Sequence, residues 1–463
     1  MRKLKIVVIG AGSASFGQSS VTDIVSAQEF KEFNLELVLV DTDEESLKRM
    51  EKLANLLKEY FKSNAKISSQ IDRKIALIDA NYVIVSVANR RWDLWQKDFY
   101  IPAAYGFKHV FGENGGPGAA FHTLRSLHLM IPIAKDMERI CPNALLINFT
   151  NPESRMCLGI SKLTKIKTIG LCHGPFRTLG RISEILKKPE DEIDLTVGGI
   201  NHFHWALDIK DRITGEDLYP IIKKKINEFN WQGDTLTPLL YKVFGLIPYP
   251  APSHPGEYFN FTYSIAGPKF IDWGIGSISH SLSAKSSDLD YFVEGKSARP
   301  SYELWSYNQG ERVRRVLSGE LSLLTEKDLL HNLSFIDKSG ELAIPIITDI
   351  ECEKNKKEMA ANLLNKGNAV SNLPEDAIVE VPIQVNSNGI QPVKVGALPE
   401  AIAGICNLQI SIQNLLVKAY QENSKELLLQ ALLIDPIVDD FERCKKMMET
   451  MLKVQVEFLP ILE

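Results

Sequence analysis

Nearly uninterrupted apolar runs alternate with helix-like segments over the first 170 residues of the chain. The runs are Ile6–Gly10, Leu35–Val40, Tyr82–Val87, Ala144–Asn148 and Lys167–Leu171, and a helical stretch from Asp43 to about Tyr60 follows the second of them. Runs of this length without polar alternation are typical of strands that are buried on both faces of a parallel sheet. The pattern therefore predicts a doubly wound, Rossmann-type α/β domain over residues 1–170.

The remainder of the chain, residues 171–463, has a more mixed pattern. Proline and aromatic residues concentrate in Ile247–Tyr263, and helical periodicity returns in Ala401–Glu422, Lys425–Leu433 and Val438–Val456. No repeat and no low-complexity linker separates this part from the first. We expect a second α/β (α+β) domain that packs tightly on the Rossmann-type domain.

Composition and charge argue against several classes of protein. The 463 residues carry 58 acidic and 53 basic side chains without a long block of like charge, so nothing indicates a nucleic-acid partner. The apolar run after the basic residues 2–5 is shorter than the roughly 7–15 residues of a secretory signal, and no window approaches the roughly 20 apolar residues of a membrane span. Six scattered cysteines without a CxxC pair favour reduced thiols and a cytoplasmic location.

A glycine-rich loop follows the first predicted strand and precedes a helix. It reads GAGSASFG from Gly10 onward, so Ser15 replaces the third glycine of a GxGxxG fingerprint. Glycines let the backbone turn sharply and approach a pyrophosphate at the helix N-terminus. Asp41 ends the second strand, where a carboxylate accepts hydrogen bonds from ribose hydroxyls and repels a 2′-phosphate. We predict that Gly10, Gly12, Ser13 and Asp41 bind NAD rather than NADP; a tight turn with a solvated carboxylate is the alternative.

Polar residues also follow the next two predicted strands, at the edge where a doubly wound sheet binds its ligands. Asn89 comes after the third strand and is predicted to contact the cofactor. Asn151 and Pro152 follow the fourth strand, as in lactate and malate dehydrogenases, whose architecture we expect here. A buried asparagine needs partners for its amide, and the hydroxyls of a substrate would supply them. A capping role in a turn is the alternative for Asn151.

Three further residues are candidates for chemistry. Cys172 follows the fifth strand, and His202 lies in a polar break about thirty residues later. Thiolate and imidazole together suit a borderline divalent transition metal, although a single cysteine is more often a small buried apolar residue. Glu113 is the one carboxylate of the segment FGENGGPG, which looks like a loop that approaches a ligand. A surface loop with an incidental glutamate is the alternative.

Together these motifs resemble glycoside hydrolase family 4. The matching segments are GAGSASFG, GENGGPG, NFTNP, LCHGP and GGINH, followed by VEVPIQVNSNGIQPVKVGALP (Val379–Pro399) and LLQALLIDP (Leu428–Pro436), and they run in order over nearly the whole chain. The resemblance implies a Rossmann domain joined to a second domain that completes the active site and mediates oligomerisation, so a homodimer or homotetramer is expected. It also implies tightly bound NAD and a divalent metal, typically Mn²⁺.

The chemistry that this resemblance implies differs from that of glycosidases with two catalytic carboxylates. Hydride leaves C3 of the sugar, a base removes the acidified C2 proton, the aglycone is eliminated, water adds and the hydride returns. Cys172 and His202 would be the metal ligands. Asn151 and Asn201 would contact sugar hydroxyls, and Glu113 takes the place of the general acid.

The base that removes the C2 proton is the point at which the chain departs from the family pattern. Related enzymes often have an aspartate a few residues before a His-x-x-Glu-Tyr sequence, and here Pro252 occupies that place. His254 and Tyr258 are therefore the candidates for the base. Glu257 is set aside as a residue that orients one of them.

The substrate expected from the resemblance is an unphosphorylated α-glycoside. Branches of the family with Cys-Asn at the metal motif act on 6-phosphoglycosides, whereas this chain has Cys172-His173-Gly174. An α-glucoside, an α-galactoside or an α-uronide fits, and His173 with Arg90 and Arg91 would serve the carboxylate of a uronide. The main alternative is an NAD-dependent 2-hydroxy acid dehydrogenase of the lactate or malate type. A nucleotide-sensing regulator without a working base is a second alternative.

Overall fold

A parallel sheet forms the first half of the molecule. The computed structural model describes residues 1–13, 16–266, 310–324 and 334–463, so Ala14 and Ser15 of the glycine loop lie outside the described residues. Six strands pair in parallel in the order β3-β2-β1-β4-β5-β6. They are β1 (Lys3–Ile9), β2 (Asn34–Val40), β3 (Lys66–Gln70), β4 (Tyr82–Val85), β5 (Leu145–Asn148) and β6 (Lys167–Gly170). This order is that of the doubly wound dinucleotide-binding fold.

An antiparallel half continues the same sheet. Its strands are β7 (Ile193–Ile200), β8 (Phe203–Asp211), β9 (Lys356–Leu364), β10 (Ile378–Asn386) and β11 (Gly389–Pro392). β9 lies beside β6, and the order runs on as β9-β10-β7-β8, with β11 on β10. Two of the joints are narrow: a single residue pair, Gly170 with Asn362, links β6 to β9, and another, Glu380 with Gly199, links β10 to β7.

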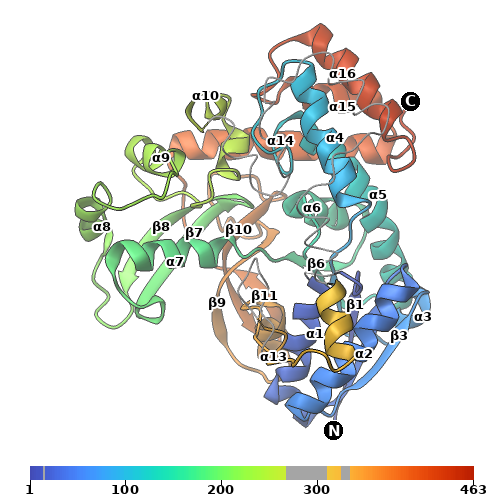
Figure 1. Cartoon of the computed structure of the whole chain (residues 1–463). Coiled ribbons are helices and arrows are strands. Elements are labelled where there is room, and N and C mark those ends of the chain that lie inside the picture. The colour runs from blue at the N-terminus through green and yellow to red at the C-terminus, as the bar shows by residue number, and fades with distance from the viewer. Residues whose placement is uncertain (14–15, 267–309, 325–333) are drawn as a thin grey trace.

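Helices pack around the sheet, and further helices lie beyond it at two ends of the molecule (Figure 1). The described α-helices are α1 (Phe16–Ser26), α2 (Glu44–Phe61), α3 (Arg73–Leu77), α4 (Arg91–Ala104), α5 (Gly116–Ile140), α6 (Glu153–Leu163), α7 (Gly174–Leu186), α8 (Tyr219–Lys225), α9 (Leu236–Phe244), α10 (Thr262–Ala266), α13 (Ala343–Glu351), α14 (Glu400–Glu422), α15 (Lys425–Leu433) and α16 (Phe441–Val454). The described residues also form three short 3₁₀ helices, which are η1 (Gln28–Glu32), η2 (Glu190–Glu192) and η3 (Pro255–Tyr258).

The apolar runs of the sequence form strands that are buried on both faces. In β1, the alternating residues Leu4, Ile6 and Val8 belong to one apolar cluster, and Val7 and Ile9 belong to another on the opposite face. This arrangement requires helices on both sides of the sheet, which explains why the runs show no polar alternation. The prediction of a Rossmann-type sheet with a second, mixed part is therefore confirmed.

The segment FGENGGPG is a loop only as far as Gly115, because Gly116 begins α5 with Pro117 in its first turn, where proline costs no hydrogen bond. The boundary at residue 170 stays a prediction, since the sheet is continuous across it.

All six cysteines are free. Among the described residues, no helix is long and apolar enough to cross a membrane.

Candidate active site

The glycine loop after β1 is held in a conformation that requires glycine. Gly10 has φ +86°, and a Cβ atom there would lie 1.9 Å from the carbonyl oxygen of Ser86. The amide of Gly12 donates a hydrogen bond to Oδ2 of Asp41 (2.8 Å), and the amide of Asp43 donates to Oδ1 (3.0 Å). The carboxylate at the end of β2 therefore braces the loop, a contact that the sequence did not predict for it.

A cavity of about 710 Å³ lies at the carboxyl ends of β1, β2, β4 and β5. This volume is within the range of small-molecule and cofactor sites. Its lining includes all five residues predicted to bind the cofactor and one predicted to bind substrate, namely Gly10, Gly12, Ser13, Asp41, Asn89 and Asn151. The residues that we selected from separate strand ends thus share one cavity.

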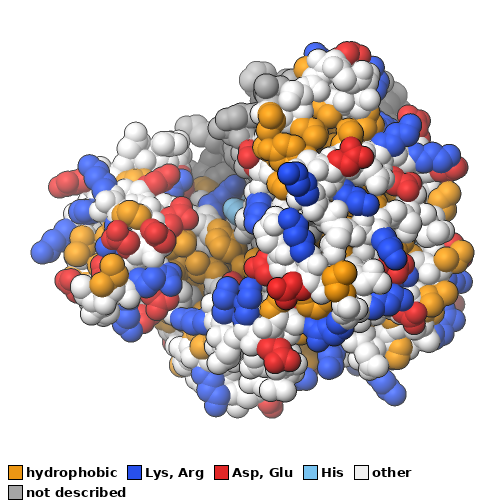
Figure 2. All heavy atoms as spheres, turned by 90° about the horizontal axis from the view of Figure 1, so that it is seen from below, with side chains coloured by type: hydrophobic (Ala, Val, Ile, Leu, Met, Phe, Trp, Pro, Cys, Tyr) orange, Lys and Arg blue, Asp and Glu red, His pale blue; other side chains and the backbone are white. Residues whose placement is uncertain are grey.

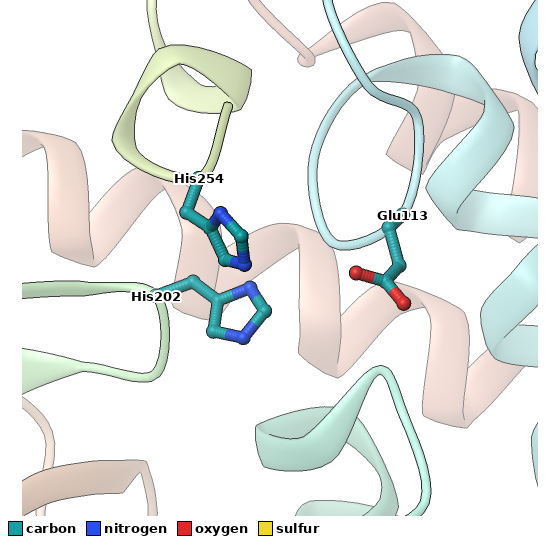
Figure 3. Close-up of side chains that lie close together, drawn as sticks. All are labelled: Glu113, His202 and His254. Atoms are coloured by element: carbon teal, nitrogen blue, oxygen red, sulfur yellow. The ribbon is translucent and has the colours of Figure 1, made fainter. Parts of the chain in front are cut away.

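A second group of side chains faces a common point (Figure 3). Glu113 comes from the loop before α5, His202 from the turn between β7 and β8, and His254 from the loop before η3. One potential ligand atom from each lies within 4.8 Å of the others. The two imidazole rings are 4.2 Å apart between centroids at an interplanar angle of 61°. A carboxylate and two imidazoles can hold a metal ion or move protons.

Glu113 connects this group to the cavity. Its Oε1 accepts hydrogen bonds from Arg91 (2.9 Å) and from the side-chain amide of Asn151 (3.2 Å), and both donors line the cavity. Because both donors contact Oε1, Oε2 is the oxygen that could exchange a proton with a ligand. The predicted acid and a predicted substrate contact are therefore brought together.

Glu257 shapes the Glu113 loop instead of orienting a base. Its Oε1 accepts hydrogen bonds from the amides of Glu113 (2.6 Å) and Asn114 (3.0 Å). Burial, together with the nearby Glu113 carboxylate, raises the pKa of Glu257 to about 8. The role that the sequence suggested for Glu257, orienting His254 or Tyr258, does not correspond to these contacts.

His202 occupies a strained turn. Ile200 pairs with Phe203, so only Asn201 and His202 connect β7 to β8, and His202 has φ +63°. This left-handed region costs a non-glycine residue roughly 1–2 kcal/mol. The side-chain amide of Asn114 hydrogen-bonds Nδ1 of His202 at 3.0 Å, which leaves Nε2 as the nitrogen for a ligand. Burial lowers the pKa of His202 well below its usual value, so the ring is neutral.

Cys172 lies beside this group but is not one of its three converging members. Its Sγ accepts a hydrogen bond from the amide of Gly174 at 3.4 Å, and burial raises its pKa. A Cβ atom on Gly174 would lie 3.5 Å from that Sγ and 3.4 Å from Cζ of Tyr249, whose ring centroid is 6.0 Å from that of His202. Joint ligation by Cys172 and His202 stays a prediction. Tyr249, which is buried near both residues, was missed because one aromatic residue in an aromatic segment gives no signal.

The two candidate bases have different surroundings. His254 is half-buried, its Nδ1 hydrogen-bonds the Ser253 hydroxyl (2.9 Å), and burial, with the Arg177 charge next in size, lowers its pKa to about 3. The His254 ring is thus neutral, as is that of His202. The Tyr258 hydroxyl donates to the backbone carbonyl of Asn201 at 3.2 Å, and burial raises the pKa of Tyr258 well above its usual value.

His173 is exposed at the start of α7. Its Nδ1 lies 3.4 Å from Oε1 of Glu341, and its ring stacks on Phe176 at 5.4 Å between centroids. Contact between His173 and a substrate stays a prediction.

A hollow separates the lobe of β7, β8 and α8 from the rest of the molecule when it is seen from below, and a histidine side chain is visible inside it (Figure 2).

Two family models match the chain. The model described as family 4 glycosyl hydrolase matches residues 5–188, and that of the family 4 glycosyl hydrolase C-terminal domain matches residues 197–438. The chain is 28% identical to an alpha-glucosidase of Erwinia rhapontici, covering 99% of each chain, and 30% identical to an alpha-galactosidase of Bacillus subtilis (strain 168), covering 93% of each.

Solved structures show the same fold. A crystal structure of a 6-phospho-alpha-glucosidase from gut microorganisms, in complex with NAD and Mn²⁺, superimposes with a TM-score of 0.79. The alignment covers 100% of both chains at 22% sequence identity. The whole architecture, with both halves of the sheet, is therefore shared.

Proposed function

Because the chain belongs to family 4 of the glycosyl hydrolases, we propose that it cleaves unphosphorylated α-glycosides with the help of NAD and a divalent metal ion, with Mn²⁺ as the proposed ion. One observation carries this proposal. Arg91 and Asn151 line the large cavity and also donate hydrogen bonds to Glu113. A dinucleotide in the cavity would thus share a wall with the proposed acid.

The loop and the cavity fit NAD. Gly10 lines the cavity in a left-handed backbone conformation that favours glycine, which is typical of the tight turn that brings a backbone to a pyrophosphate. Asp41 lines the cavity while it braces the loop, and its charge opposes a 2′-phosphate. These features support NAD rather than NADP as the proposed cofactor.

The donor groups also fit a divalent cation. His202 offers Nε2 as a neutral imidazole nitrogen, and Cys172 offers a sulfur close to the same tyrosine. The Oδ1 atom of Asn201 is buried and accepts no hydrogen bond from the described part of the chain. We propose Cys172 and His202 as ligands, and Glu113, His202 and His254 as the alternative set.

The protein side chains then have separate tasks. When bound, NAD would supply a hydride acceptor for the sugar, and the cation would supply a Lewis acid that stabilises negative charge on sugar oxygens. His254 removes the C2 proton, because its neutral imidazole lies against His202. Glu113 protonates the departing oxygen from Oε2, while Asn151 and Asn201 bind sugar hydroxyls. Tyr258 is the second candidate for the base.

The choice between a neutral α-glycoside and an α-uronide depends on the partners of three basic side chains. Arg91 contacts Glu113, His173 faces Glu341, and the Arg90 guanidinium lies over the ring of Phe458 at 5.7 Å. These residues were the reason to consider a uronide, and each has a partner within the protein. A neutral α-glucoside or α-galactoside is therefore favoured over an α-uronide.

A panel of nitrophenyl α-glycosides tests the function. The purified chain, with NAD, Mn²⁺ and a thiol reductant, is expected to release nitrophenol from the glucoside or galactoside and not from the 6-phosphoglucoside. Removal of the bound NAD, or addition of EDTA, is expected to stop the release. Activity on phosphorylated substrates alone would contradict the proposed specificity. Accumulation of NADH with a 2-hydroxy acid would instead indicate a dehydrogenase.

Substitution of Glu113 tests the proposed acid. A nitrophenolate leaves with little help from a proton, whereas an alkoxide needs one, and general acids contribute about 10²–10⁴-fold. Glu113→Gln is therefore expected to lower kcat/KM for methyl glycosides by that factor and for nitrophenyl glycosides by far less. Steady-state kinetics on both substrates give the comparison. Equal losses would assign Glu113 a structural role through Arg91 and Asn151.

A further inference from the structure

One motif of the sequence has no place in the proposed chemistry. Glu380 belongs to the segment that begins at Val379, and it lies in β10 with only 1% of its surface exposed. A buried carboxylate is costly unless it is hydrogen-bonded. Glu380 is therefore a residue whose contacts need an explanation.

The Glu380 carboxylate joins side chains from three directions. Oε2 lies 2.5 Å from Nδ1 of His204 in β8, and the Nε2 atom of that ring hydrogen-bonds Thr178 of α7 at 2.9 Å. Oε1 accepts hydrogen bonds from the side-chain amides of Asn362 in β9 (3.0 Å) and Asn201 (3.4 Å). The carboxylate lies at the narrow joint between β10 and β7, since Glu380 itself pairs with Gly199.

These contacts converge on the strained turn that presents His202. Tyr258 holds the turn through the backbone carbonyl of Asn201, and Glu380 holds it through the side chain of the same residue. Asn114 holds the His202 ring through its Nδ1 atom. A two-residue turn with an imidazole at φ +63° persists only where its surroundings hold it in place.

The contact with Glu380 also decides how the Asn201 amide is oriented. Because Nδ2 faces the carboxylate, Oδ1 points away from it, and Oδ1 is buried without a hydrogen-bond donor in the described ranges. The side-chain amide of Asn201 is thus held in one orientation, next to His202 in the chain.

We propose that Glu380 is a positioning residue, which acts through Asn201 to hold the turn that presents His202 to the divalent cation. Glu380 touches neither the cation nor the sugar in this assignment. Positioning groups behind metal ligands typically change metal affinity by about 10–100-fold when they are removed. The inference rests on the proposed function, because it assumes that the cation binds at His202.

A double-mutant cycle on Mn²⁺ affinity tests this role without measuring activity. Loss of the electron paramagnetic resonance signal of free Mn²⁺ gives the dissociation constant of the NAD-loaded, metal-free protein. Glu380→Gln is expected to raise that constant about tenfold or more. In the Asn201→Ala background, Glu380→Gln is expected to change it by less than about twofold, because the residue through which Glu380 acts is absent.

The matched control is Asn362→Ala, which removes another donor to Oε1 of Glu380 without touching the turn. It is expected to leave Mn²⁺ affinity within about threefold, below the range for positioning groups. If Glu380→Gln gives no folded protein, Glu380→Asp, which keeps the charge but shortens the reach, replaces it in the cycle.

The outcomes separate the two proposals. Equal effects of Glu380→Gln with and without Asn201, or an unchanged affinity in the single variant, would overturn the positioning role while the wild type still binds Mn²⁺. A wild type that binds no Mn²⁺ would overturn the proposed metal site and this inference with it.

Discussion

Replacement of Cys172 by serine, or of His202 by alanine, is expected to lower kcat/KM for an α-glycoside by about a thousandfold or more. Both are proposed ligands of the cation, whose charge provides several kcal/mol of stabilisation for the developing negative charge on the sugar oxygens. NAD affinity is expected to be unchanged, because the cavity lining at Gly10, Gly12 and Asp41 comes from a different part of the sheet. Kinetics and calorimetry with NAD measure the two effects.

Cys352→Ser is the matched control for the thiol. Cys352 is half-buried at the end of α13, so its replacement is expected to leave activity near that of the wild type. Full activity after verified removal of all metal would contradict the metal assignment. Mn²⁺ binding that is lost in His202→Ala but unchanged in Cys172→Ser would assign the ion to the alternative set, in which Glu113 and His254 accompany His202.

Turnover in deuterated water is expected to place deuterium at C2 of the released sugar. Direct displacement at C1 never breaks the C2–H bond, whereas the proposed reaction requires a base to remove that proton and solvent to exchange with it. His254→Ala is expected to abolish the incorporation and to lower kcat by about 10²–10⁴-fold. Mass spectrometry or proton nuclear magnetic resonance of the product measures the label.

Tyr258→Phe provides the comparison for the base. The Tyr258 hydroxyl donates to a backbone carbonyl. Its removal is therefore expected to lower the free energy of unfolding while C2 exchange continues. Loss of exchange in Tyr258→Phe with exchange retained in His254→Ala would reverse the two roles. A product of the wild type without deuterium at C2 would refute the proposed mechanism.

The parallel half of the fold could be predicted from the sequence because its strands are buried on both faces and follow one another along the chain. β3 was missed because its residues, KISSQ, are polar and half-exposed at the edge of the sheet. The insertion of β9 beside β6 was also missed. It joins residues almost two hundred positions apart through one pair, and no local pattern reports such a contact.

The candidate site divides in the same way. The glycine loop, Asp41 and Asn151 could be selected because ligands bind where parallel strands end, and the cavity brings them together. The contacts of Glu257 and Glu380 could not be predicted from the sequence. Each carboxylate meets partners that are distant in sequence, and its type and spacing are those of any acidic residue in a loop or a strand.

The backbone of His202 has a consequence for protein engineering. Glycine adopts φ +63° without steric strain. His202→Gly therefore removes the backbone strain at this position, but it also removes the proposed metal ligand. The backbone thus favours glycine at the position where the proposed chemistry needs an imidazole, while burial of the ring and its hydrogen bond to Asn114 favour histidine. A melting temperature reports only the balance of these effects, so a directed-evolution campaign needs a catalytic readout in every round.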